Sequence, residues 1–121
     1  MASYAAQQLF YDGKVQTATS GKTFTSVDPS TAKVLAKVHA ASLSDIDLAV
    51  SSAKNAFSSW SQTPAIVRSR ILLKAVSILR SRNDEIAKIE THDTGKPFSE
   101  TSIVDVATGA DVLEYLSLIH I

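Results

Sequence analysis

The stretch Glu90-Thr91-His92-Asp93-Thr94-Gly95-Lys96-Pro97 decides how the second half of the chain folds. A helical run leads into it, Gly95 is suited to end a helix, and Pro97 cannot continue one. Lys96 is pushed towards an extended conformation by the proline that follows it. The string therefore predicts a helix C-terminus followed by a tight turn.

Apolar residues recur at helical spacing on both sides of this turn. The first helix is expected to begin with Ser44 as its cap, with Asp45 and Asp47 in its first turn. A second helix follows Thr63-Pro64, a third runs into Gly95, and a fourth runs from about residue 98 to 113. The positions expected on buried stripes are Ile46, Ala49, Val50, Ala53, Ala56, Phe57 and Trp60 in the first helix, Ile71, Leu72, Ala75, Val76 and Leu79 in the second, and Ile103, Val106, Ala107, Ala110 and Leu113 in the fourth.

The first 40 residues have the pattern of short strands. Asp12-Gly13 between Leu9-Phe10-Tyr11 and Val15 is a two-residue hairpin signal, and Ser20-Gly21 marks another turn. The runs at 23–27 and 34–38 are the next two strand candidates. The predicted fold class is therefore α/β, with a β-hairpin and short strands followed by about four helices.

Composition excludes several classes of function. The 121 residues carry no net charge and include no cysteine, so a thiol nucleophile, a thiolate zinc site and a disulfide framework are excluded. The charge is unevenly distributed, because residues 1–83 carry ten Lys/Arg and four Asp/Glu, while residues 84–121 carry two and eight. Two interpretations are open: the two halves of opposite sign pack against each other, or the chain is a part of a larger protein.

Location and partners are predicted mainly by what the sequence does not contain. The lack of cysteine fits a reducing compartment, the first residues do not form a secretory signal, and no apolar run reaches membrane-spanning length. We expect a cytoplasmic protein that binds neither a membrane nor nucleic acid. The basic residues of the second helix, which could suggest a nucleic-acid surface, lack interleaved aromatic residues and are interpreted as a solvated face. They are Arg68, Arg70, Lys74, Arg80 and Arg82.

Two residues of the opening stretch have side chains that could take part in catalysis. His92 is interpreted as a helix-end residue and not as a general base, and Lys96 as a turn residue and not as a Schiff-base lysine.

The same eight residues resemble the E-T-x-D-T-G-K-P segment of the aldehyde dehydrogenase superfamily. Further blocks in the same order resemble that family: Leu9-Phe10-Tyr11-Asp12-Gly13-Lys14, Ser20-Gly21-Lys22-Thr23-Phe24, Val27-Asp28-Pro29-Ser30-Thr31, Ala41 through Phe57 with Trp60, and Arg68-Ser69-Arg70-Ile71-Leu72. Together they cover residues 9–115. The segment 99–115 is most similar to betaine-aldehyde dehydrogenases.

The resemblance implies an NAD(P)-dependent oxidoreductase that acts on a small-molecule aldehyde, here betaine aldehyde, and that forms a homo-oligomer when intact. It places residues 1–115 in the N-terminal portion of the coenzyme-binding domain. In this family a cysteine thiolate attacks the aldehyde, hydride passes to the nicotinamide, and a glutamate activates the water that releases the acid. The sequence contains no cysteine, and its four glycines are too scattered to form a phosphate loop.

We therefore expect the 121-residue chain to be an inactive fragment, without catalytic residues, catalytic glutamate or bound coenzyme of its own. The alternative is a non-catalytic helical interaction module with a β-hairpin.

The resemblance also implies one metal site. By position, the carbonyl oxygens of Ser26 and Val27 and the carboxylate of Asp105 would bind a potassium ion. The alternative is that Asp105 is a helix-face carboxylate that makes a salt bridge or a cap.

The last six residues, Leu116-Ser117-Leu118-Ile119-His120-Ile121, depart from the family pattern. One back-translation of them spells the transposon-end adapter used in sequencing libraries. Our hypothesis is that residues 116–121 are a non-native tail, which native genomic DNA continuing through codon 116 would contradict.

Overall fold

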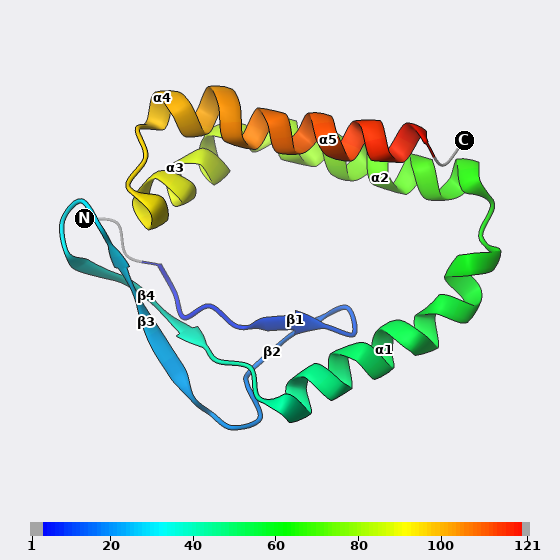
Figure 1. The fold of residues 1–121 in the computed structure, drawn as a ribbon, viewed down its shortest axis with the longest axis horizontal. Helices are drawn as coiled ribbons and strands as arrows, with labels where there is room; N and C mark the ends of the chain where they lie inside the picture. Colours follow the sequence, from blue (N-terminus) through cyan, green and yellow to red (C-terminus); the bar gives the residue numbers. More distant parts are fainter. Residues whose placement is uncertain (1–3, 120–121) are drawn as a thin grey trace. The chain divides into compact units, whose positions relative to one another are not determined.

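The computed structural model describes residues 4–119, which form two compact units (Figure 1). Four strands and helix α1 make the first unit, Met1–Gln62, and the remaining helices make the second, Thr63–Ile121. Short strands followed by helices confirm the predicted α/β class. None of the helices in the described residues is long and apolar enough to cross a membrane.

The first unit begins with the predicted hairpin, in which β1 (Leu9–Tyr11) pairs antiparallel with β2 (Lys14–Gln16). The two residues of its turn both have positive φ, 55° at Asp12 and 68° at Gly13. This is the geometry that a two-residue hairpin turn requires, and Asp-Gly adopts it at low cost.

A second antiparallel pair joins β3 (Thr23–Asp28) to β4 (Lys33–His39), with a register shift between Ser26 and Val27. In the connecting turn, the carboxylate of Asp28 accepts hydrogen bonds from the backbone N–H and the hydroxyl of Ser30, at 2.7 and 2.6 Å. Ala32 closes the turn at φ 55°, a left-handed conformation that costs an alanine roughly 1 kcal/mol.

Helix α1 (Leu43–Gln62) begins two residues earlier than expected. Ser42 is its cap, because the Asp45 backbone N–H donates to the Ser42 hydroxyl at 3.4 Å and the Asp45 carboxylate accepts from the Ser42 N–H at 2.8 Å. This reciprocal arrangement is a capping box. The prediction of Ser44 as the cap is wrong, because its hydroxyl bonds instead to the hydroxyls of Ser42 and Thr19.

Asp45 also ties the strand region to the helix. Its carboxylate accepts a second backbone hydrogen bond, from Thr19 at 3.0 Å, and its side chain is almost fully buried. The hydrogen bond from the backbone of Ser42 is the main cause that lowers the pKa of Asp45 to about 2. The loop after the hairpin is thereby held against the N-terminus of α1.

The second unit is a packed set of helices: α2 (Ala65–Ser81), α3 (Asn83–Thr94), α4 (Phe98–Glu100), the π-helix η1 (Thr101–Asp105) and α5 (Val106–Leu118). Helices α2 and α5 lie side by side and run in opposite directions (Figure 1). Small or short side chains bury at their contact, including Ser69, Ala110 and Ser117. Arg80 on α2 donates to Asp111 and Glu114 on α5.

The predicted fourth helix is present, but η1 changes the phase of its buried face. Thr101 and Val106 are both buried although they are five residues apart, which is the spacing that a π-turn produces. Ile103, placed on the buried stripe by a regular helical period, is instead 72% exposed. Ile103 was expected to be buried because a regular helical period was assumed to continue through η1, where the extra residue of the π-turn shifts the buried face.

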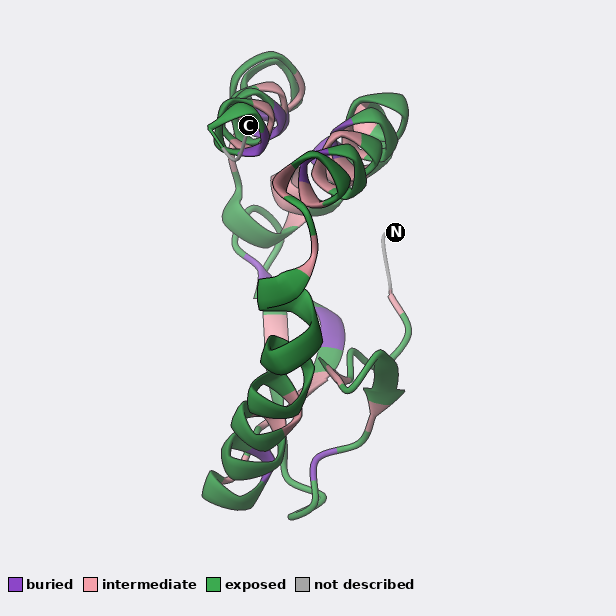
Figure 2. Ribbon diagram, turned by 90° about the vertical axis from the view of Figure 1, so that its right-hand side faces the viewer, coloured by how far each residue is buried: buried purple, intermediate pink, exposed green. Residues whose placement is uncertain are grey.

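Several other side chains expected in the core are exposed. Most of the ribbon in Figure 2 is green, and purple is confined to short stretches. Phe57 is 66% exposed and Trp60 41%, so their assignment to the core of this chain is wrong. Ile46, Val50 and Ile71 are exposed as well, whereas Val76 is buried as predicted.

The capping box on α1 leads to the first prediction. Replacing Ser42 by alanine removes the hydroxyl that accepts the Asp45 N–H, so the free energy of unfolding should fall by about 1 kcal/mol. Ser44→Ala is the matched control and should have a smaller effect, because its hydroxyl contacts only other hydroxyls. Urea unfolding followed by circular dichroism measures both, and an equal or larger loss in Ser44→Ala would contradict the assignment of the cap.

Candidate functional site

The turn that follows α3 has the geometry expected from its sequence. Gly95 adopts φ 77° and its N–H donates to the carbonyl of Thr91 at 2.9 Å. The Thr94 hydroxyl donates back to the Glu90 carbonyl at 2.7 Å and accepts the Lys96 N–H at 3.3 Å. The left-handed glycine ends the helix and directs Lys96 out of the helical path.

The Lys96 side chain is the centre of a charged cluster within the second unit. Its Nζ lies 2.7 Å from the Asp105 carboxylate and 3.9 Å from that of Glu100. The hydrogen bond to Lys96 lowers the pKa of Asp105, and the same bond raises the pKa of Lys96. Burial and the nearby negative charge of Asp105 raise the pKa of Glu90. Lys96 is thus a paired residue, where the sequence indicated an ordinary solvated turn lysine.

Two uncharged contacts also hold the π-turn against α3. The hydroxyls of Thr91 and Thr101 are 2.8 Å apart, and Thr101 has no exposed surface. The Asn83 side chain donates to the carbonyl of Ser102 at 3.0 Å. Together with Lys96 and Asp105, these contacts make η1 a fixed part of the unit. These contacts fix the position of the η1 backbone, and they do not activate any side chain as a nucleophile.

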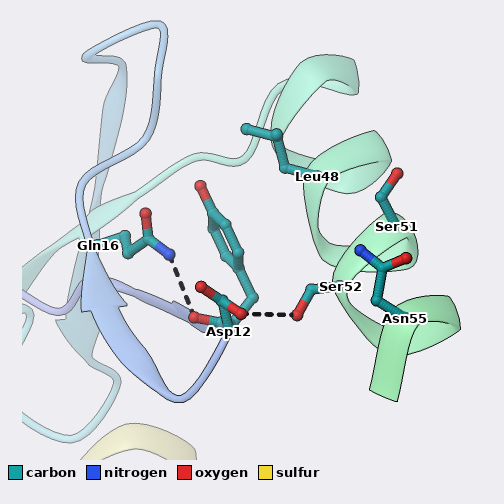
Figure 3. Close-up of a pocket in the computed structure, with 7 residues that line it drawn as sticks. Asp12, Gln16, Leu48, Ser51, Ser52 and Asn55 are labelled. Carbon is teal, nitrogen blue, oxygen red and sulfur yellow. Dashed lines mark hydrogen bonds between the residues drawn. The ribbon is translucent and has the colours of Figure 1, made fainter. Parts of the chain in front are cut away.

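A shallow cleft of about 350 Å³ lies in the first unit, between the hairpin and α1 (Figure 3). Most of the residues that line it carry a polar group: Tyr11, Asp12, Gln16, Leu48, Ser51, Ser52 and Asn55. The Ser52 hydroxyl donates to Asp12 at 3.2 Å, and the Gln16 amide donates to the Tyr11 carbonyl at 3.1 Å. Sequence reasoning missed this cleft, although polar residues at helical spacing in α1 are a signal for it.

The residues of the predicted potassium site fall in two units. Ser26 and Val27 are adjacent on β3, at its register shift, and Asp105 is in η1. The Asp105 carboxylate makes the salt bridge that was the alternative interpretation of this residue. No group of three or more histidine, cysteine or acidic side chains suited to a metal occurs in residues 4–119.

The Lys96 cluster leads to the second prediction. Replacing Lys96 by methionine keeps much of the aliphatic stem and removes the ammonium, so the pKa of Asp105 should rise towards its ordinary value. A carboxylate with a lowered folded-state pKa stabilises the fold above its unfolded pKa and loses that contribution as the pH falls. The variant should therefore lose less stability on acidification than the parent chain.

Carboxyl NMR titration measures the pKa, and unfolding curves at several pH values measure the stability. Lys88→Met is the control, because Lys88 is exposed and forms no ion pair within residues 4–119. An unchanged Asp105 pKa in Lys96→Met would contradict the role of the ion pair.

Comparison with known proteins places these units in a family. The model of the aldehyde dehydrogenase family matches residues 15–118. Among solved structures, PnpE from Pseudomonas sp. WBC-3 is 33% identical, with a TM-score of 0.92 over 94% of this chain and 23% of PnpE. PnpE has also been crystallised in complex with nicotinamide adenine dinucleotide.

Two further structures give the same result. Gamma-glutamyl-gamma-aminobutyraldehyde dehydrogenase from Burkholderia cenocepacia J2315 is 34% identical, with a TM-score of 0.91 over 94% of this chain and 24% of that one. An indole-3-acetaldehyde dehydrogenase complexed with NAD+ is 33% identical, with a TM-score of 0.90 over 93% of this chain and 23% of its own. The chain thus spans about a quarter of the length of these relatives. Since sequence and fold agree over nearly all of its length, the chain belongs to the aldehyde dehydrogenase family.

Proposed function

We propose that this chain contributes part of the coenzyme-binding domain of an enzyme that uses NAD(P) to oxidise a small-molecule aldehyde to the acid. The observation that carries the proposal is the family match over residues 15–118. The NAD complexes of two matched structures support the choice of coenzyme.

The residues of this chain have a structural role in such an enzyme and do not react with the substrate. The family chemistry needs a thiol that forms a covalent adduct with the aldehyde, and the 121 residues contain no cysteine. Their contribution is to hold the hairpin on α1 through Asp45, and to hold the π-turn on α3 through Thr91 and Lys96. These side chains would hold the backbone that surrounds an active site, without contacting the substrate themselves.

The substrate is proposed at two levels. An aldehyde follows from the family, and betaine aldehyde is the member suggested by the similarity of residues 99–115. The matched structures that name a substrate name other aldehydes, gamma-glutamyl-gamma-aminobutyraldehyde and indole-3-acetaldehyde. Betaine aldehyde is therefore proposed as the first substrate to test. A cytoplasmic location and a homo-oligomeric intact enzyme are proposed on the same resemblance, the first supported by the absence of cysteine.

The purified 121-residue chain should produce no NADH from NAD+ and any aldehyde, because it lacks the thiol. A chimera in which this chain replaces the matched segment of the indole-3-acetaldehyde dehydrogenase should regain NAD-dependent aldehyde oxidation. The rate of NADH formation measures both. A chimera in which the cysteine expected from the family chemistry is changed to alanine is the control and should be inactive.

Two results would contradict this proposal. NADH formation by the purified chain, free of contaminating enzyme, would show that its chemistry is its own. A chimera that folds but neither binds NAD+ nor turns over would show that the segment does not support the family's site, as would be expected of a self-sufficient helical interaction module.

The potassium site is proposed for the intact protein. Its oxygen ligands suit a hard cation, but within this chain Asp105 is already neutralised by Lys96 at 2.7 Å, so the described residues do not by themselves fit the ion. If the site forms, the chimera should unfold at a higher temperature in potassium chloride than in choline chloride at equal ionic strength. Asp105→Asn should remove the difference, and equal midpoints for the unchanged chimera would contradict the proposal.

A further inference from the structure

The turn between α3 and α4 brings a cation to a carboxylate within the second unit (Figure 1). Lys96 Nζ lies 2.7 Å from Asp105 Oδ2, at ion-pair distance, and the Asp105 side chain is only 21% exposed. Because the pair is partly covered by protein, dissolved salt screens it less than it screens an exposed pair. Asp105 therefore has a counter-ion that belongs to the chain itself.

Both members of the pair are held in place by contacts that do not involve their charges. The Lys96 N–H donates to the Thr94 hydroxyl at 3.3 Å, in the turn that the left-handed Gly95 begins. On the other side of the pair, η1 is held by the hydrogen bond from the Asn83 side chain to the Ser102 carbonyl at 3.0 Å. The ammonium thus reaches the carboxylate from a preset backbone, and little backbone freedom has to be lost to form the pair.

The surroundings of the pair are acidic, but they do not form a metal site on their own. Glu100 lies 3.9 Å from the same ammonium, so Lys96 is shared between two carboxylates. No group of three or more histidine, cysteine or acidic side chains suited to a metal occurs in the part of the chain that the structure describes. The lysine ammonium therefore balances this negative charge within the described residues.

A lysine ammonium and a potassium ion make the same kind of contact with a carboxylate. Both are compact monovalent cations, and both bind oxygen atoms. Two positive charges beside one carboxylate repel each other strongly where water is partly excluded. The ion and the ammonium are therefore alternatives at Asp105, and a lysine tethered beside the carboxylate has the advantage of a high local concentration.

We propose that Lys96 competes with the potassium ion for Asp105, so that the carboxylate accepts the ion only after it has released the ammonium. The inference rests on the potassium site proposed above for the intact enzyme, and it names the residue that regulates that site. Lys96 then sets the potassium concentration at which the site fills. Without the ion, the ammonium keeps Asp105 paired and the end of η1 in place.

The chimera with the indole-3-acetaldehyde dehydrogenase tests the competition, with its melting temperature measured against the concentration of potassium chloride. Choline chloride keeps the ionic strength constant. Lys96→Met removes the ammonium and should lower the half-saturating potassium concentration roughly tenfold. Lys96→Arg keeps a positive charge and should lower it much less. Lys88 is exposed and forms no ion pair within residues 4–119, so Lys88→Met is the matched control and should leave the value unchanged.

Two further variants keep the test decisive if the methionine disturbs the fold. Lys96→Gln removes the charge but keeps a polar side chain, and it should lower the half-saturating concentration as Lys96→Met does. Asp105→Asn removes the carboxylate for which the two cations compete. It should abolish the potassium-dependent rise in melting temperature, both in the parent chimera and in the Lys96→Met chimera.

Three outcomes would overturn the proposal, and they can be told apart. A half-saturating concentration that is equal in the parent and in Lys96→Met would leave the potassium site but show no competition. A higher value in Lys96→Met would show that Lys96 helps to build the site. If potassium raises the melting temperature of none of the chimeras, both the site and the competition are contradicted, whereas the role in aldehyde oxidation is decided separately by NADH formation in the same chimera.

Discussion

A shortage of buried apolar surface is the constraint on which this structure depends. Within residues 4–119, only seven apolar side chains are buried, and four of them are alanines: Ala18, Leu35, Ala36, Val76, Ala87, Val106 and Ala110. Because hydrophobic stabilisation scales with the apolar area removed from water, alanines contribute little of it. Hydrogen bonds and ion pairs therefore decide much of the local geometry where elements meet, as between Thr19 and Asp45 and between Lys96 and Asp105.

The buried carboxylate of Asp45 illustrates this. It accepts backbone hydrogen bonds from Thr19 and Ser42, and so orients both the loop before β3 and the start of α1. In the second unit the Thr91–Thr101 hydroxyl pair and the Lys96–Asp105 ion pair act in the same way on the π-turn. The eight-residue stretch that identifies the family is thus also the stretch that fixes the course of the helix after it.

Features with a local cause could be predicted from the sequence. Asp12-Gly13 requires positive φ at a hairpin turn, and Gly95 before Lys96-Pro97 can only end a helix, so both were confirmed. The π-turn could not be predicted, because its extra residue is stabilised by contacts from α3 that are distant in sequence. Nor could the exposure of Phe57 and Trp60, since periodicity identifies the apolar face of a helix but not what covers it.

That last distinction also separates the role of this chain from the chemistry of its family. Phe57 and Trp60 of α1 are exposed in a chain that spans about a quarter of the length of its relatives. The family chemistry likewise needs a group from outside these residues, because the 121 residues that carry the family's signature contain no cysteine. The exposed face of α1 and the missing cysteine therefore have one explanation. The helices and strands described here form a scaffold, and the groups that would pack on it or react beside it are not among these residues.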